Sequence, residues 1–171
     1  PNRRYLQQRM EQRVADSDPT AEPLLLIMVD IDHFKRINDR LGHLAGDQAL
    51  VHVAQLLLDC QGEGDVVVRW GGEEFLWLVP GSSPELAAAR CEALQQALQA
   101  RPLVHAGQSL ALTVSMGWCP HPLWPALPTD CHLTLRVADD ALYQAKTGGR
   151  NRWVGYVAGT TLETLPGLET G

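Results

Sequence analysis

Apolar and polar residues alternate in blocks along the chain, and the periods of these blocks predict its helices and strands. The continuous apolar run at 24–29 is typical of a strand that is buried on both faces. A β-branched run at 65–68 and an apolar run at 75–79 predict a β-hairpin around Gly71-Gly72, whose glycines are expected to supply the positive φ of a tight turn. Helical spacing or composition predicts helices at about 3–16, 33–41, 46–60, 84–100 and 133–146.

The second half of the chain adds more strands to this pattern. A strand near 102–105 is expected to pair, across residues 106–108, with a central strand at 110–118. The proline-rich residues 119–130 predict an irregular loop, and residues 151–157 predict a last strand. This order of elements favours an α+β fold in which one sheet with mixed or antiparallel pairing is layered with helices. We expect residues 1–157 to form one domain and the Thr- and Gly-rich residues 158–171 to be a disordered tail.

Composition narrows the class of protein. A net charge of −6 argues against a nucleic-acid surface, which would need a basic stripe. No apolar run approaches the roughly 20 residues that span a bilayer, and no signal peptide opens the chain, so we expect a cytoplasmic domain. Four widely spaced cysteines without a Cys-x-x-Cys pair indicate reduced thiols. A start at Pro1 suggests a fragment of a longer protein, whose full length could be membrane-anchored.

Carboxylates stand at two positions where a charge is costly. Asp30 ends the buried strand, and Glu73 and Glu74 begin a strand that otherwise has the composition of a core. If the two strands are neighbours, their carboxylates converge at one edge of the sheet and suit Mg²⁺, which takes substrate phosphates as further ligands. The structural alternative is a solvated hairpin tip. A similar alternative applies to Asp47, whose charge would satisfy the dipole of a helix beginning near Gly46.

Positive groups that could bind a polyphosphate flank these carboxylates in the sequence. Lys35 stands at the front of a short helix, whose first N–H groups can also bind anions, and Lys146 and Arg150 flank a Gly-Gly turn. The residues alone therefore indicate nucleotide-dependent phosphoryl or nucleotidyl transfer. For Asp32 and Asp39 we expect solvated or capping roles, with the role of a neighbour to the metal or base as the alternative.

Four sequence blocks together resemble the GGDEF domain of diguanylate cyclases. They follow the family's order and spacing, cover roughly residues 24–155, and include an active-type Gly-Gly-Glu-Glu-Phe signature. The resemblance implies a central, mostly antiparallel five-stranded sheet surrounded by helices, as in nucleotidyl cyclases and palm domains with a ferredoxin-like core. The blocks are Asp30 to Asp39, Gly42-His43-x-x-Gly46-Asp47, Arg69 to Phe75, and Ala138 to Asn151.

The resemblance also implies a reaction and a set of roles. Two GTP molecules, one in each subunit of a face-to-face homodimer, would condense to cyclic di-GMP with loss of two pyrophosphates, as the output of an upstream sensory or regulatory domain. The metal, Mg²⁺ with Mn²⁺ as an alternative, would be bound by Asp30, the carbonyl of Ile31, Glu73 and Glu74, and either glutamate could assist deprotonation of the 3′-hydroxyl. Asn38 and Asp47 would read guanine between the apolar walls Phe34 and Leu50. The residues that contact phosphates would be Lys35, Lys146 and Arg150. Lys35 would also be a catalytic residue, together with Glu73 and Glu74.

One position departs from the family pattern. The product-inhibition motif Arg-x-x-Asp is here Gly62-Glu63-Gly64-Asp65, and glycine cannot make the contacts of a guanidinium. We therefore expect weak or absent feedback inhibition through this site. Two alternatives remain at this point, a catalytically silent module that binds GTP or cyclic di-GMP, and a nucleotidyl cyclase of broader base specificity.

Overall fold

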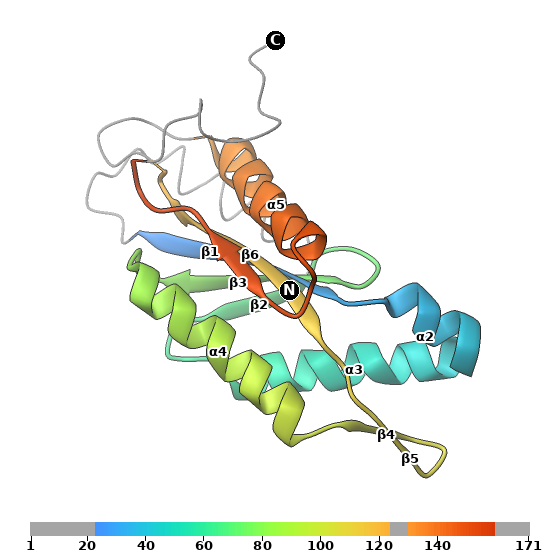
Figure 1. Ribbon diagram of the computed structural model, residues 1–171. Helices are drawn as coiled ribbons and strands as arrows, with labels where there is room; N and C mark the ends of the chain where they lie inside the picture. Colours follow the sequence, from blue (N-terminus) through green and yellow to red (C-terminus); the bar gives the residue numbers. More distant parts are fainter. Residues whose placement is uncertain (1–22, 124–129, 160–171) are drawn as a thin grey trace.

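The sheet that the hydrophobic pattern predicts forms the centre of the structure. The computed structural model describes residues 23–123 and 130–159, and in these residues five strands form one sheet in the order β2-β3-β1-β6-β7 (Figure 1). Neighbouring strands are antiparallel except β6 and β7, which are parallel. The α+β class and the mostly antiparallel five-stranded sheet are therefore confirmed. The strands are β1 (Leu24–Ile31), β2 (Val66–Arg69), β3 (Glu74–Pro80), β6 (Val114–His121) and β7 (Trp153–Gly155).

Helices cover both faces of this sheet, as Figure 1 shows, with α5 on one face and α3 and α4 on the other. Every residue of β1 is buried, as the unbroken apolar run predicts. Side chains alternate across the pleat, so Leu25 and Ile27 belong to the core on the side of α3 and α4, while Leu26 and Met28 belong to the core under α5. The helices are α2 (Phe34–Leu41), α3 (His43–Asp59), α4 (Pro84–Ala100) and α5 (Cys131–Thr147).

The junction between α2 and α3 differs from its prediction. Helix α3 begins at His43 rather than near Gly46, because the chain changes direction at the single residue Gly42. Gly42 has a φ of +85°, which residues with a Cβ rarely adopt. Asp47 consequently lies in the second turn of α3, where a carboxylate gains less from the helix dipole than it would in the first. This weakens the structural explanation for the charge of Asp47.

The strand pairing predicted for the second half of the chain is wrong in one respect. Among the residues that the structure describes, strands β4 (Leu103–His105) and β5 (Gln108–Leu110) pair only with each other and form a small second sheet. The turn between them consists of Ala106 and Gly107, with φ of +48° and +79°. Two positive φ angles in succession make a tight turn, which lies where a turn was predicted. Strand β5 ends at Leu110, and residues 111–113 separate it from β6, so the single strand predicted at 110–118 is two strands in two different sheets.

Strand β6 is central, as predicted, but it occupies a different part of the chain. It begins at Val114, pairs with β1 and β7, and continues to His121, so the first residues of the predicted loop 119–130 belong to a strand. Residues 124–129 of that loop lie outside the described residues, as do the predicted helix at 3–16 and most of the predicted tail. Among the helices of the described ranges, none has the length and apolar character needed to cross a membrane.

Candidate functional site

Three carboxylates from two neighbouring strands meet at one end of the sheet. Asp30, the penultimate residue of β1, stands opposite Glu74, the first residue of β3. The backbone N–H of Ile31 donates to the carbonyl of Glu73 at 3.3 Å, which ties the end of β1 to the hairpin. Asp30 is buried, with 6% of its surface exposed, and both glutamates are half-buried. The structure thus brings together the four residues for which metal binding was predicted.

The hairpin tip that carries the glutamates is wider than the sequence predicts. Strand β2 ends at Arg69 and β3 begins at Glu74, so residues 70–73 form the turn, and neither Gly71 nor Gly72 has a positive φ. The expectation that these glycines supply positive φ is therefore wrong. The first glycine instead provides space, because a Cβ on Gly71 would lie 3.0 Å from Oε2 of Glu74. The missing side chain lets this carboxylate lie against the turn.

Arg69 fixes the conformation of the tip. Its Nε and Nη2 both donate to the carbonyl of Gly72, at 3.0 and 2.7 Å. The N–H groups of Trp70 and Gly71 donate to the carbonyl of Glu74 at 2.8 and 3.3 Å. These bonds hold the backbone on both sides of Glu73. Arg69 had no predicted role, although a guanidinium directly before a Gly-Gly turn can donate to the carbonyls of that turn and is recognisable in the sequence.

Lys146 connects the last helix to this carboxylate centre. Its Nζ lies 2.8 Å from Oδ2 of Asp30, in a pair that is largely shielded from water. Burial raises the pKa of Asp30 from 3.8 to about 6, and the nearby charges of Glu73 and Glu74 add to this effect, whereas Lys146 lowers the pKa. Lys146 therefore offsets part of the cost of placing three carboxylates together.

The raised pKa of Asp30 predicts a pH-dependent stability difference between the wild type and Asp30→Asn. A carboxyl group that binds its proton more tightly in the folded state loses stability as pH rises from about 4 to about 6. Asn stays neutral over this range. In EDTA, the wild type should therefore lose stability relative to the variant as pH rises. The difference in free energy of unfolding, variant minus wild type, should increase by roughly 1–3 kcal/mol between pH 4 and pH 7. Urea denaturation at several pH values measures this, and a pH-independent difference would contradict it.

The donor set at this end of the sheet fits a divalent cation. Carboxylate and carbonyl oxygens are the ligands of Mg²⁺, and Mn²⁺ accepts the same atoms. A cation next to Asp30 would also favour its ionised form, whose solvation is lost on burial. The residues present are therefore suited to the metal that the sequence implies.

Helices α2 and α3 carry the residues predicted to read a base. Asn38 lies on α2 with its side-chain amide against the backbone of Gly46 on α3, and Asp47 is the next residue of α3. Phe34 is half-buried and packs against the apolar cluster that contains Leu50. Asp47 is exposed, as a group that binds a ligand from solution must be. The structure thus places the four predicted base-site residues on one pair of adjoining helices.

The three predicted phosphate-binding residues are not equally placed. Lys146 is brought to Asp30 in the last turn of α5. Lys35 is exposed in the first turn of α2, and Arg150 is exposed just beyond α5, with a φ of +59°. Within the described ranges neither Lys35 nor Arg150 forms an ion pair. Both side chains are therefore at the surface, where a polyphosphate could meet them.

Asp32 differs from its prediction as a solvated or capping residue. It is 5% exposed, and its carboxylate accepts hydrogen bonds from Thr113 Oγ1 at 2.7 Å, Ser115 Oγ at 2.6 Å and the backbone N–H of Asn151 at 3.0 Å. These bonds join the end of β1 to β6 and to the segment after α5. Asp32 therefore fixes the segment next to Arg150 relative to the end of the sheet.

The departure from the inhibition motif has a structural counterpart. The side chain of Asp65 is buried, and its Oδ2 accepts hydrogen bonds from the N–H of Gly62 at 2.9 Å, Trp77 Nε1 at 3.0 Å and Arg90 Nε at 3.0 Å. A Cβ at position 62 would lie 1.8 Å from Arg90 Nη2. The guanidinium of Arg90, which sequence analysis did not single out, therefore occupies the space next to Gly62 and pairs with the acid of the motif.

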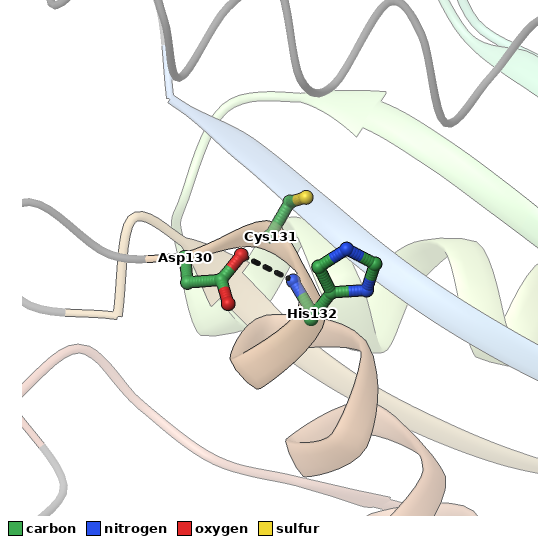
Figure 2. Close-up of side chains that lie close together, drawn as sticks. All are labelled: Asp130, Cys131 and His132. Carbon is green, nitrogen blue, oxygen red and sulfur yellow. Dashed lines mark hydrogen bonds between the residues drawn. The ribbon is translucent and has the colours of Figure 1, made fainter.

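A second group of ligand-type side chains stands at the start of α5 (Figure 2). Asp130 precedes the helix, and its carboxylate accepts a hydrogen bond from the backbone N–H of His132 at 3.0 Å, as an N-cap does. Cys131 is 2% exposed and belongs to the core under α5. The group therefore has a structural explanation as a helix start.

Fold and site together define an α+β domain of the nucleotidyl cyclase or palm type with an acidic centre at one end of its sheet. Comparison with known proteins identifies the family. The model of the family described as "Diguanylate cyclase, GGDEF domain" matches residues 1–152. The chain therefore belongs to the GGDEF family.

Individual relatives agree with this assignment. The chain is 41% identical over 152 residues to diguanylate cyclase DgcP of Pseudomonas aeruginosa, a match that covers 89% of the chain and 22% of DgcP. Among solved structures, it resembles diguanylate cyclase SiaD of P. aeruginosa in complex with its activator SiaC, with a TM-score of 0.83, 33% identity, and coverage of 91% of this chain and 58% of that one. It also resembles the active GGEEF domain of a diguanylate cyclase from Vibrio cholerae, with a TM-score of 0.74, 30% identity, and coverage of 94% and 98%.

Proposed function

We propose that this domain condenses two molecules of GTP into cyclic di-GMP and releases two pyrophosphates. The observation that supports this most strongly is the cluster of Asp30, Glu73 and Glu74 with Lys146 at 2.8 Å, next to a pair of helices that carries Asn38 and Asp47. Such a site combines groups for a metal–triphosphate with groups for a base. The named diguanylate cyclases among the relatives support the same activity.

The proposed reaction assigns metal-binding or phosphate-binding roles to residues of the site. One or two ions of Mg²⁺ or Mn²⁺ would be held by Asp30, Glu73, Glu74 and the carbonyl of Ile31. Such an ion, when bound, neutralises charge on the phosphates and favours attack at the α-phosphorus. Lys35, Lys146 and Arg150 would bind the β- and γ-phosphates and stabilise the pyrophosphate as it leaves. Lys146 would then exchange its bond to Asp30 for a phosphate oxygen.

The bond changes require two copies of the site. The 3′-oxygen of one GTP attacks the α-phosphorus of the other, the α–β phosphoanhydride bond breaks, and the 3′-hydroxyl proton passes to a base, for which Glu74 beside Gly71 is our candidate. The same step with the roles reversed closes the ring. Because one domain holds one GTP, we propose a homodimer in which the two half-sites face each other.

The full-length protein is proposed to couple this domain to an upstream sensory or regulatory domain. The chain spans 22% of DgcP, so most of that relative lies outside the matched region. The structure of the relative SiaD is that of a diguanylate cyclase in complex with its activator SiaC, which supports the proposal of a regulatory partner. We do not propose a nucleic-acid partner, since the net charge is −6.

Base specificity provides a direct test of the proposal. The domain is incubated with Mg²⁺ and either GTP or ATP, and pyrophosphate release is followed. We expect release from GTP at a rate at least about tenfold above that from ATP, because Asn38 and Asp47 complement the edge of guanine. Asn38→Ala should reduce affinity for GTP far more than affinity for the metal. Equal turnover of GTP and ATP would contradict the guanine assignment, and GTP binding without turnover would favour a silent module.

The Gly62 and Arg90 arrangement predicts little feedback inhibition. Cyclic di-GMP would need a free guanidinium and a free carboxylate at this site, but in this domain Asp65 is already bound to Arg90. Titration of cyclic di-GMP into the nucleotide-free protein, followed by calorimetry, should therefore show weak or no binding through this site. The rate of pyrophosphate release should stay nearly constant as product is added. Tight binding that Arg90→Ala abolishes would contradict the prediction.

A further inference from the structure

The side chain of Asn38 on α2 lies against the backbone of α3 at Gly46. A Cβ built on this residue would lie 2.0 Å from Oδ1, 2.9 Å from Cγ and 3.2 Å from Nδ2 of Asn38. All three distances are shorter than an ordinary van der Waals contact, so an added methyl group would collide with the whole amide rather than with one atom. The amide of Asn38 is therefore seated on the bare backbone of α3.

The backbone conformation gives no reason for a glycine at this position. Gly46 is buried inside α3, and its φ is not among the positive values found for other glycines of the described residues. Glycine in the middle of a helix is less stable than alanine, because more backbone freedom is lost on folding. An alanine at position 46 would place its methyl group in the space that the side chain of Asn38 occupies.

The position of Gly46 in the chain connects it to the other base-reading residue. Asp47 follows directly on α3, so the backbone that supports the Asn38 amide also carries the Asp47 carboxylate. The separation of the two groups consequently depends on how closely the amide of Asn38 lies against the backbone of Gly46. A base edge that bonds to both groups tolerates little change in that separation, because hydrogen bonds weaken steeply with distance and angle.

We propose that Gly46 is a positioning residue that holds the amide of Asn38 at the correct distance from Asp47 and thereby sets the preference for guanine over adenine. This inference rests on the proposed function, in which Asn38 and Asp47 read guanine. Gly46 acts through Asn38 and need not touch the nucleotide itself.

A variant at this position should keep its fold. The atoms that an alanine methyl would meet belong to the end of a flexible, half-buried side chain, and rotation of Asn38 relieves the collision without moving either helix. Gly46→Ala should therefore fold normally and displace one functional group. This makes nucleotide binding, rather than stability, the property that the substitution changes.

A double-mutant cycle tests the proposal. Wild type, Gly46→Ala, Asn38→Ala and the double variant are titrated with GTP and with ATP in Mg²⁺ by calorimetry. We expect each single substitution to weaken GTP binding by about tenfold and to leave ATP binding nearly unchanged. The double variant should bind GTP no more weakly than Asn38→Ala, because the methyl then has no amide to displace.

Thermal unfolding without nucleotide provides an independent measurement. Once Asn38 is alanine, adding Gly46→Ala should raise the unfolding temperature, because the helix gains a better helix former at a position with free space. A lower unfolding temperature, wild-type GTP affinity in Gly46→Ala, or additive losses in the double variant would each overturn the role of Gly46. If Asn38→Ala leaves GTP affinity unchanged, the guanine role of Asn38 fails instead, and the role of Gly46 in specificity fails with it.

Discussion

Glu73→Gln is expected to reduce the formation of cyclic di-GMP by about a hundredfold or more while the domain remains folded. Gln has nearly the shape of Glu but lacks the charge that offsets a divalent cation, and Glu73 stands with Asp30 where the metal is proposed to bind. The rate of product formation from GTP and Mg²⁺ is measured by chromatography, and circular dichroism checks the fold.

A matched substitution separates this effect from a general loss of charge. Glu85 is exposed in the first turn of α4, which follows the end of β3 opposite to Glu74, so Glu85→Gln removes the same charge outside the site. Its activity should equal that of the wild type. Wild-type activity in Glu73→Gln as well would show that this carboxylate is not needed and would contradict the assignment of the site.

Gly117→Ala is expected to give the largest loss of stability, about 3 kcal/mol or more in the free energy of unfolding. A Cβ on Gly117 in β6 would lie 2.1 Å from the backbone nitrogen of Leu142 and 2.3 Å from the carbonyl oxygen of Ala138, both in α5. Because these are backbone atoms, no side-chain rotation relieves the collision, and α5 must move away from the sheet. Urea denaturation measures the difference.

The control for this prediction is a glycine with open space. A Cβ on Gly72 meets no atom within 4 Å, and its φ is not positive, so Gly72→Ala should leave the free energy of unfolding nearly unchanged. If Gly117→Ala were as stable as this control, the close packing of α5 on β6 would be wrong. Such packing also matters for the site, because α5 carries Lys146 to Asp30.

The parts of the fold that sequence predicts well are those with a strong local signal. The unbroken apolar run of β1 gave a fully buried strand, and Asp30 stands near its end as expected. The two runs that flank Gly71-Gly72 gave the β2–β3 hairpin. The turn at residues 106–107 lies where it was predicted, but the break at residues 111–113 between β5 and β6 was missed, because these three residues include no Gly or Pro to mark it.

The contacts that complete the site join residues far apart in the chain, and local patterns cannot reveal them. The pair of Lys146 with Asp30, the bonds of Asp32 to Thr113 and Asn151, and the pair of Arg90 with Asp65 all form only after helices pack on the sheet. In the same way, glycines whose role is space can be recognised only from the atoms around them. Gly46 and Gly71 are both of this kind.

The most direct test of the proposed function is the identity of the product. The domain is incubated with GTP and Mg²⁺ over a series of protein concentrations, and the nucleotides are separated by chromatography. We expect cyclic di-GMP, formed at a rate that rises more than in proportion to protein concentration because two half-sites must meet, and we expect Glu73→Ala to form none. GTP that binds but yields no cyclic di-GMP at any concentration would contradict the proposed cyclase activity.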